Sequence, residues 1–129
     1  MSRESVTLRG RAAAENGMQD ACDIKRRTGE TTSGGVVTPT WSTLYTGQKC
    51  RVQTRLESSA PTDVGQASVM LQRREVHLPM AVVGLRPDDR ITITGSLDPE
   101  LVGTVFVIRD VLAKTYATAR RVTVIEVTS

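Results

Sequence analysis

The sequence contains few of the residues on which catalysis and cofactor binding usually depend. His77 is the single histidine among 129 residues, and four aromatic residues make up 3% of the chain. The sequence has no glycine-rich phosphate loop, no cluster of metal ligands with the usual spacing and no evident nucleophile–base pair. These absences argue against an enzyme and against a cofactor or metal site. They favour a protein that works through its shape and surface.

Cysteines and long apolar runs are also scarce. Cys22 and Cys50 are the two cysteines, and no run approaches the roughly 18 apolar residues that a membrane span requires. The polar start of the chain does not resemble a signal peptide. We therefore expect no membrane association and a reducing cytosol, in which both cysteines are small buried hydrophobic residues.

The residues that are abundant favour strands. Valine, isoleucine and threonine account for 38 of the 129 positions, and these β-branched residues suit pleated sheets. Segments with strand-like alternation recur about every ten residues, which is typical of barrels and sandwiches. We predict a mainly β protein of one domain, 1–129: an N-terminal helical arm at 1–19, then a small antiparallel β-barrel at 20–129 with a long flexible loop between two long strands.

The beginning of the chain has helical spacing. Residues 4–19 carry small or apolar side chains along one face, and Ser2 or Ser5 is suited to capping the start. The small residues of this face let another backbone approach closely. Two interpretations stay open: the face packs against its own domain, or it packs against a neighbouring subunit. The residues of this candidate subunit interface are Gly10, Ala13, Ala14 and Gly17.

The period changes to two from Asp20 onward. Cys22 and Ile24 alternate with polar residues in a first strand, and the glycine-rich segment from Thr28 to Gly35 predicts a hairpin loop. A strand from Trp41 to Tyr45 is expected to break at Gly47. The remaining expected strands cover 50–56, 67–78 with a bulge or a bend within Gln72–Glu75, 91–93, 105–108 and 120–127, with turns at 86–89 and 98–103.

Residues 57–66 have no periodic pattern and interrupt two long strands. A hairpin needs only about two to five linking residues, so this segment is longer than the geometry demands. We therefore interpret it as a mobile functional loop. Its residues are Glu57, Ser58, Ser59, Ala60, Pro61, Thr62, Asp63, Val64, Gly65 and Gln66.

Several residues invite a chemical interpretation but have simpler explanations. A lone histidine on a strand, such as His77, is usually exposed or hydrogen-bonded. Asp88 and Asp89 follow Pro87 and fit a turn better than a metal pair. The three arginine doublets, at 26–27, 73–74 and 120–121, fit surface solvation or salt bridges between subunits better than phosphate binding, because neighbours on a strand point to opposite faces.

The order and spacing of several short strings resemble one protein family over nearly the whole chain. That family is the head-to-tail connector proteins of the stopper type, also called head-closure or head–tail joining proteins, from tailed bacteriophages of actinobacteria. The strings are Cys22-Asp23-Ile24, Leu44-Tyr45-Thr46-Gly47, Cys50-Arg51-Val52-Gln53, Leu78-Pro79, Pro87-Asp88-Asp89-Arg90-Ile91, Asp98-Pro99-Glu100-Leu101-Val102-Gly103 and Ala119-Arg120-Arg121-Val122.

This resemblance implies a structural protein of the virion neck, assembled in the host cytoplasm. Six or twelve copies would form a ring below the portal and adaptor and above the tail terminator or tail tube. The ring would close the channel through which packaged double-stranded DNA passes, and the loop 57–66 would project towards that channel. Glu57 and Asp63 would keep it from adhering to DNA phosphates.

Three alternatives remain. The first is a tail terminator, because such a protein would be built from a similar barrel and would show the same sequence pattern. A nucleic-acid-binding barrel of the OB type would need a platform of aromatic residues for base stacking, and the four aromatic residues lie in separate segments; the net charge of +3 is also modest. A small β hydrolase would need a nucleophile and a base.

Overall fold

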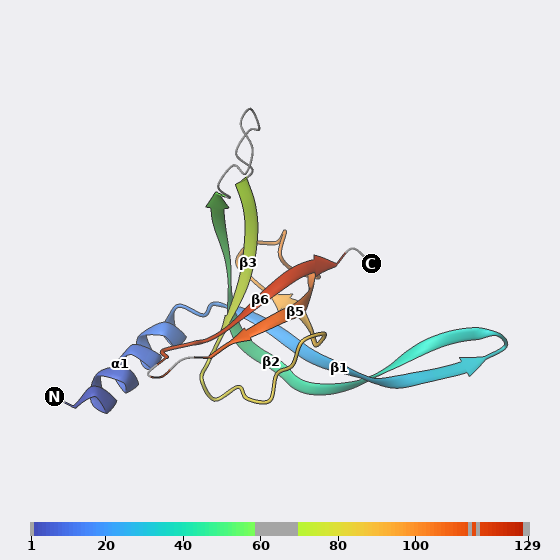
Figure 1. Ribbon diagram of the computed structural model, residues 1–129, viewed down its shortest axis with the longest axis horizontal. Coiled ribbons are helices and arrows are strands. Elements are labelled where there is room, and N and C mark those ends of the chain that lie inside the picture. Colours follow the sequence, from blue (N-terminus) through green and yellow to red (C-terminus); the bar gives the residue numbers. More distant parts are fainter. Residues whose placement is uncertain (1, 59–69, 114, 116, 128–129) are drawn as a thin grey trace.

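The computed structural model describes residues 2–58, 70–113, 115 and 117–127 (Figure 1). Helix α1 (Arg3–Asn16) begins at Ser2, whose hydroxyl oxygen accepts a hydrogen bond from the Ser5 backbone N–H at 3.2 Å. The helix therefore starts at one of the two predicted caps and ends before Gly17. It is followed by β1 (Asp20–Ser33), β2 (Val36–Ser58), β3 (Met70–Leu78), β4 (Arg90–Gly95), β5 (Val105–Leu112) and β6 (Arg120–Val127).

The six strands form one antiparallel sheet that closes on itself in the order β1-β2-β3-β6-β5-β4. Closure joins β3 to β6 and β1 to β4, pairs that are distant in sequence. A closed sheet leaves no open edge within the ring of strands. The predicted mainly β fold, a small antiparallel barrel preceded by a helix, is confirmed.

Side chains fill the inside of the barrel. Phe106 is the one aromatic residue among the fully buried residues that the structure describes. Arg74 lies over the Phe106 ring, 5.8 Å from its centre, and reaches Glu126 at 3.3 Å. The core is otherwise aliphatic, as expected from the composition. Its members are Cys22, Ile24, Cys50, Val76, Leu78, Val82, Leu85, Ile91, Ile93, Phe106, Ile108, Val122 and Val124. A six-stranded barrel packed in this way is a solid core and does not serve as a pore.

The segment 79–89 packs against the barrel, although it contains no strand or helix. It inserts Val82 into the core. The Tyr45 hydroxyl donates to the Val83 carbonyl at 2.9 Å and accepts from the Val83 N–H at 3.0 Å. Arg120 donates to the carbonyls of Val82 and Met80. Side chains of β2 and β6 thus supply hydrogen bonds to the backbone at positions 80, 82 and 83, whereas Asp88 and Asp89 bond to the Ile108 backbone in β5.

The predicted turn at 86–89 is present and contains a buried ion pair. The Asp89 N–H donates to the Arg86 carbonyl at 3.2 Å, and Asp88 has a φ of 76°. Asp89 is 2% exposed. Its carboxylate accepts two hydrogen bonds from the Arg26 guanidinium, at 2.9 and 2.8 Å, and one from the Arg86 N–H at 2.8 Å. The carboxylate of Asp89 also raises the pKa of Arg26. Asp89 is thus both a turn residue, as predicted, and a structural anchor between the turn and β1.

The predicted loop from Thr28 to Gly35 is wrong. Strand β1 continues to Ser33, and only Gly34 and Gly35 form the turn, with φ values of 58° and 81°. Positive φ at both central residues is what a two-residue type I′ hairpin turn requires, and glycine adopts it without strain. The threonines that suggested a loop are good strand residues, and they form a ribbon that leaves the barrel.

Gly47 does not break the strand as expected. It lies within β2, with a φ of 61°, where the register between β1 and β2 shifts. Its N–H donates to the Asp23 carboxylate at 2.9 Å. The glycine therefore forms a β-bulge that re-aims a single continuous strand.

Of the bulge or bend predicted within Gln72–Glu75, the bulge is absent. Strands β2 and β3 pair in one unbroken register from Arg51↔His77 to Ser58↔Met70. The pairing of β3 with β6 ends at Arg74. Before Arg74, Leu71 occupies an odd position, whereas Val76 and Leu78 after it occupy even positions. The alternation can change there because the strand has left the barrel and has no face that must point into the core. Residues 67–69, expected in the same strand, lie outside the described residues.

Cys22 and Cys50 are both buried and unoxidised, and they lie on adjacent strands. Their placement confirms the prediction of small buried hydrophobic residues. A hydrogen bond with Cys50 and burial both raise the pKa of the Cys22 thiol above its usual value of 9.0.

We expect stability to fall at high pH because of Cys22. Above pH 9 the thiol ionises in the unfolded chain but stays protonated in the fold, so the unfolded state gains stability. The free energy of unfolding should decrease by up to about 1.4 kcal/mol per pH unit from this group. Urea titrations from pH 8 to 10.5 on the unaltered protein and on Cys22→Ala would measure the effect. Equal slopes for both proteins would contradict it.

Candidate interaction surfaces

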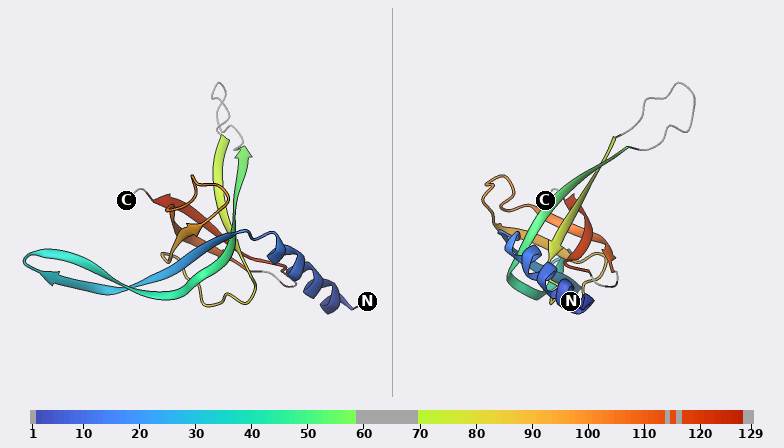
Figure 2. Two further views of the ribbon diagram at one scale, coloured as in Figure 1. Left: turned by 180° about the vertical axis from the view of Figure 1, so that it is seen from behind. Right: turned by 90° about the vertical axis from the view of Figure 1, so that its left-hand side faces the viewer.

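Three elements project from the barrel (Figures 1 and 2). Helix α1 lies at one end of the long axis. At the other end extends a two-stranded ribbon, residues 27–41, in which β1 and β2 pair only with each other because pairing of β1 with β4 ends at Lys25. The third element is the outer part of the β2–β3 hairpin. The protomer therefore presents different surfaces in different directions.

The outer β2–β3 hairpin carries the start of the predicted channel loop. Glu57 and Ser58 are the last residues of β2 and pair with Leu71 and Met70. This pairing lies beyond Arg74, where β3 has left β6, so the strand ends stand outside the barrel (Figure 1). The predicted loop residues 59–66 lie outside the described residues.

Gly10, one of the residues of the predicted interface on the helix, faces the rest of its own chain. A Cβ atom added to Gly10 would lie 2.7 Å from Cγ2 of Thr118. Arg11 donates to the Ala117 carbonyl at 3.1 Å, and Glu15 forms an ion pair with Lys49 at 3.1 Å. These contacts fix the helix to the barrel and favour packing within the domain for this part of the helix.

The other predicted interface residues differ in exposure. Ala13 and Gly17 are exposed, and Ala14 is half-buried. Val6 and Leu8, which are 55% and 63% exposed, extend the free surface of the helix. A role of the helix in contacts between subunits stays a prediction that now concerns Ala13 and its exposed neighbours.

The contact between Gly10 and Thr118 leads to a test by a double-mutant cycle. In an open helix, Gly10→Ala would stabilise the protein by about 1 kcal/mol through helix propensity. We expect that gain to be lost here, because the new methyl group meets Thr118. It should reappear when Thr118→Ser removes the methyl group. Thermal unfolding of the four proteins gives the coupling free energy, and a full gain from Gly10→Ala alone would contradict the contact.

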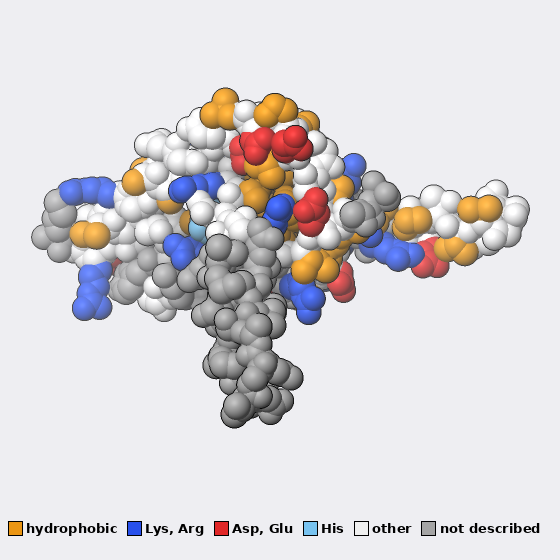
Figure 3. Space-filling view, turned by 90° about the horizontal axis from the view of Figure 1, so that it is seen from above, with side chains coloured by type: hydrophobic (Ala, Val, Ile, Leu, Met, Phe, Trp, Pro, Cys, Tyr) orange, Lys and Arg blue, Asp and Glu red, His pale blue; other side chains and the backbone are white. Residues whose placement is uncertain are grey.

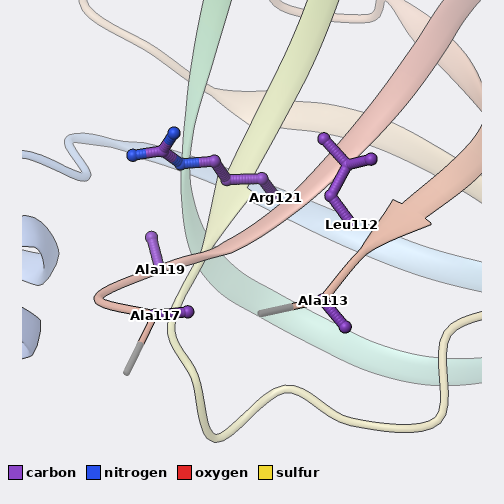
Figure 4. A pocket seen from close by; sticks show the side chains of 5 residues that line it. All are labelled: Leu112, Ala113, Ala117, Ala119 and Arg121. Carbon is purple, nitrogen blue, oxygen red and sulfur yellow. The ribbon is translucent and has the colours of Figure 1, made fainter. Parts of the chain in front are cut away.

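A small apolar pocket lies between the end of β5 and the start of β6, beside the helix (Figure 4). Its volume is about 110 Å³. Ala117 and Ala119 form its buried wall, and Leu112 is 46% exposed. The Arg121 side chain extends past Ala119 in Figure 4, and its guanidinium has no partner among the described residues. The pocket is lined by Leu112, Ala113, Ala117, Ala119 and Arg121.

The arginine doublets mostly serve contacts within the chain. Arg26 binds Asp89, Arg27 pairs with Glu30, Arg74 pairs with Glu126 and Arg120 binds backbone carbonyls. The Arg73 side chain is outside the described residues. Arg121 alone among the described members of the doublets is left to face a partner.

His77 is hydrogen-bonded, as predicted. Its Nε2 lies 3.2 Å from a carboxylate oxygen of Glu75, which is 3% exposed. In the described part of the chain, no three residues of the types His, Cys, Asp and Glu gather as a metal site would require. The described residues also contain no helix long and apolar enough to cross a bilayer.

Two surfaces were missed by the sequence interpretation. Val36 and Val37, near the ribbon tip, are 64% and 54% exposed, and Figure 3 shows separate hydrophobic side chains along the ribbon. The apolar residues Val37, Pro39 and Trp41 alternate with threonines, and this pattern was a signal for the second strand of the ribbon. The pocket has no comparable signal, because it forms only when β5 and β6 pair.

The chain matches the model of one protein family and no curated protein. The match covers residues 10–125, which include the end of the helix, the whole projecting ribbon and the pocket. The chain belongs to the family of unknown function DUF6093.

Proposed function

We propose that this protein is a structural component of the neck of a tailed bacteriophage, a head-to-tail stopper. Six or twelve copies form a ring below the portal and adaptor and above the tail terminator or tail tube. The ring closes the DNA channel after packaging and provides the surface on which the tail docks. The proposal rests on the resemblance of the sequence, and it places the protein in the virion after assembly in the host cytoplasm.

The observation that supports this function best is the position of the β2–β3 hairpin. Pairing with β6 stops at Arg74, so Ser58 and Met70 stand clear of the barrel. The segment that joins them starts from the end of a two-stranded stalk. In a ring, such a stalk is suited to carrying the segment towards a common axis. Because each barrel is filled, the DNA channel must lie between the copies and not through them.

A tail terminator remains an alternative, because the same fold and ring would serve it. The nucleic-acid-binding alternative is less well supported by the aromatic side chains. Phe106 is buried, Tyr45 is bonded to Val83, and the Trp41 ring is covered by Arg90, whose guanidinium carbon lies 4.8 Å from the ring centre. Base stacking requires exposed aromatic faces.

The test uses DNA-filled heads that carry portal and adaptor but no stopper. We expect the purified protein to bind these heads as a ring and to prevent loss of DNA. A variant in which residues 57–66 are replaced by a short glycine–serine linker should still bind but should let DNA escape. Leu97→Ser, at an exposed position of another connection, is the control and should retain the DNA.

Three other outcomes would overturn the stopper function. Binding to isolated tails and not to heads would indicate a tail terminator. Steeply salt-dependent affinity for short oligonucleotides, without head binding, would indicate a nucleic-acid-binding module. Full DNA retention by the linker variant would show that 57–66 is not the closing element.

A further inference from the structure

The ribbon tip and the pocket beside the helix are two apolar features at opposite ends of the protomer (Figures 1 and 2). We propose that they bind each other between copies: Val37 of one protomer inserts into the pocket of the next, and Glu30 pairs there with Arg121. This contact deepens the proposed ring and relies on the proposed function only for where the ring acts.

The pairing register places the relevant side chains on one face of the ribbon. Thr32 pairs with Val37, and Glu30 pairs with Pro39. Paired residues point to the same face and alternate residues share a face, so Val37 and Glu30 lie two positions apart on that face. Val36 points to the opposite face. The ribbon therefore presents an aliphatic side chain and a carboxylate together.

The pocket has a matching arrangement of apolar wall and positive charge. A cavity of about 150 Å³ lined by aliphatic residues accepts a benzene molecule, so a volume of about 110 Å³ suits a small branched side chain such as valine. Arg121 supplies guanidinium donors beside the alanine wall (Figure 4). The ribbon's carboxylate and this cation are complementary in charge.

Glu30 is available for such an exchange of partners. Its present partner is Arg27, and the two side chains are 53% and 49% exposed. Exposed ion pairs contribute little to stability and are easily replaced. A second cation from a neighbouring protomer can therefore share or take over the carboxylate at small cost.

The structure of the ribbon favours contact with another protein surface. A two-stranded hairpin is marginally stable in water, and its unpaired edges expose backbone donors and acceptors. Contact with a second copy would cover Val37, which is 54% exposed. Because the two complementary surfaces are different and lie at opposite ends, the contact is head-to-tail. Contacts of this kind close into rings when the rotation between copies permits.

Disulfide trapping in the full chain tests the contact directly. Val37→Cys mixed with Ala113→Cys should give a covalent dimer under mild oxidation, and the double variant should give a ladder of multimers. Val83→Cys with Ala113→Cys is the control, since Val83 is 60% exposed and lies elsewhere. Cys22 and Cys50 are fully buried and should not react.

A second measurement compares the two faces of the ribbon. Val37→Asp should raise the concentration needed for half-assembly about tenfold or more, because the aliphatic side chain that would be buried in the pocket is lost. Val36→Asp introduces the same charge on the opposite face and should leave assembly unchanged. Sedimentation velocity over a concentration series gives both values.

The outcomes separate this contact from the proposed function. Multimer ladders specific to positions 37 and 113, with assembly weakened by Val37→Asp alone, would support the contact. Absence of the ladder, equal trapping by the control pair, or equal effects of Val36→Asp and Val37→Asp would overturn it. If the unaltered protein binds heads but no ladder forms there, the contact is wrong and the stopper stands. A specific ladder without head binding leaves the contact and removes the stopper.

Discussion

Replacing Phe106 by alanine is expected to lower the free energy of unfolding by about 4 kcal/mol. Phe106 is fully buried and is the one aromatic side chain of an otherwise aliphatic core. Its loss removes the largest apolar group and leaves a cavity under Arg74, which lies over the ring. Since domains of this size are stable by only about 5–15 kcal/mol, the variant should be close to unfolding at physiological temperature.

The control for this substitution is Phe106→Leu, which keeps most of the volume. This variant should lower the free energy of unfolding by about 1.5 kcal/mol or less. Urea unfolding followed by far-ultraviolet circular dichroism measures both variants at the whole barrel, whereas Trp41 fluorescence would report the ribbon base. A loss below 1 kcal/mol for Phe106→Ala would mean that the barrel does not depend on this ring.

Asp89→Asn is expected to lower the free energy of unfolding by about 3 kcal/mol, a large effect for the exchange of one heavy atom. The carboxylate holds three hydrogen bonds, and the amide can accept only on one oxygen. The Arg26 guanidinium would then lack its anion in a partly buried place. The turn loses its carboxylate link to β1, although Arg26 can still donate to the Gly84 carbonyl, so local opening of the turn should precede global unfolding.

Asp88→Asn is the matched control for Asp89→Asn. It removes the same charge from the adjacent, exposed residue, and asparagine tolerates the positive φ found there. We expect a change within about 0.5 kcal/mol. Hydrogen exchange of the amides of residues 82–89 would show the local opening in Asp89→Asn, and equal protection in both variants would rule out the anchoring role.

Local pattern predicted the strands whose surroundings are simple. Strand β6 has the predicted bounds, Arg120–Val127, because Val122 and Val124 alternate with polar residues along a half-buried strand. The start of the helix was likewise predicted from its capping serine, and the turn at 86–89 was predicted from its proline. In each case the deciding interactions lie within a few residues of one another.

The features that were missed depend on residues far apart in sequence. The partner of Asp89 is Arg26, 63 positions away, so the turn was predictable but the anchor was not. The sequence predicted a loop from Thr28 to Gly35 because glycine and threonine occur both in loops and in strands. Only the pairing of β1 with β2 shows that this segment is part of a ribbon. For the candidate surfaces, the sequence indicated the hairpin loop and the small-residue helix face, but not the pocket or the ribbon tip.

Strand β2 directly connects two of the three projections, the ribbon and the outer β2–β3 hairpin. It runs without interruption for 23 residues, from Val36 at the ribbon tip to Ser58 at the outer β2–β3 hairpin, a contour of about 75 Å. Gly47 forms the bulge along it, between the ribbon and the barrel wall, and its N–H is bonded to the Asp23 carboxylate. If the proposed contact between copies holds, a pull on the ribbon by a neighbouring copy would act along this one strand on the stalk. Because Cys50 of the same strand is buried in the core, such a pull would also bear on the barrel wall between the two projections.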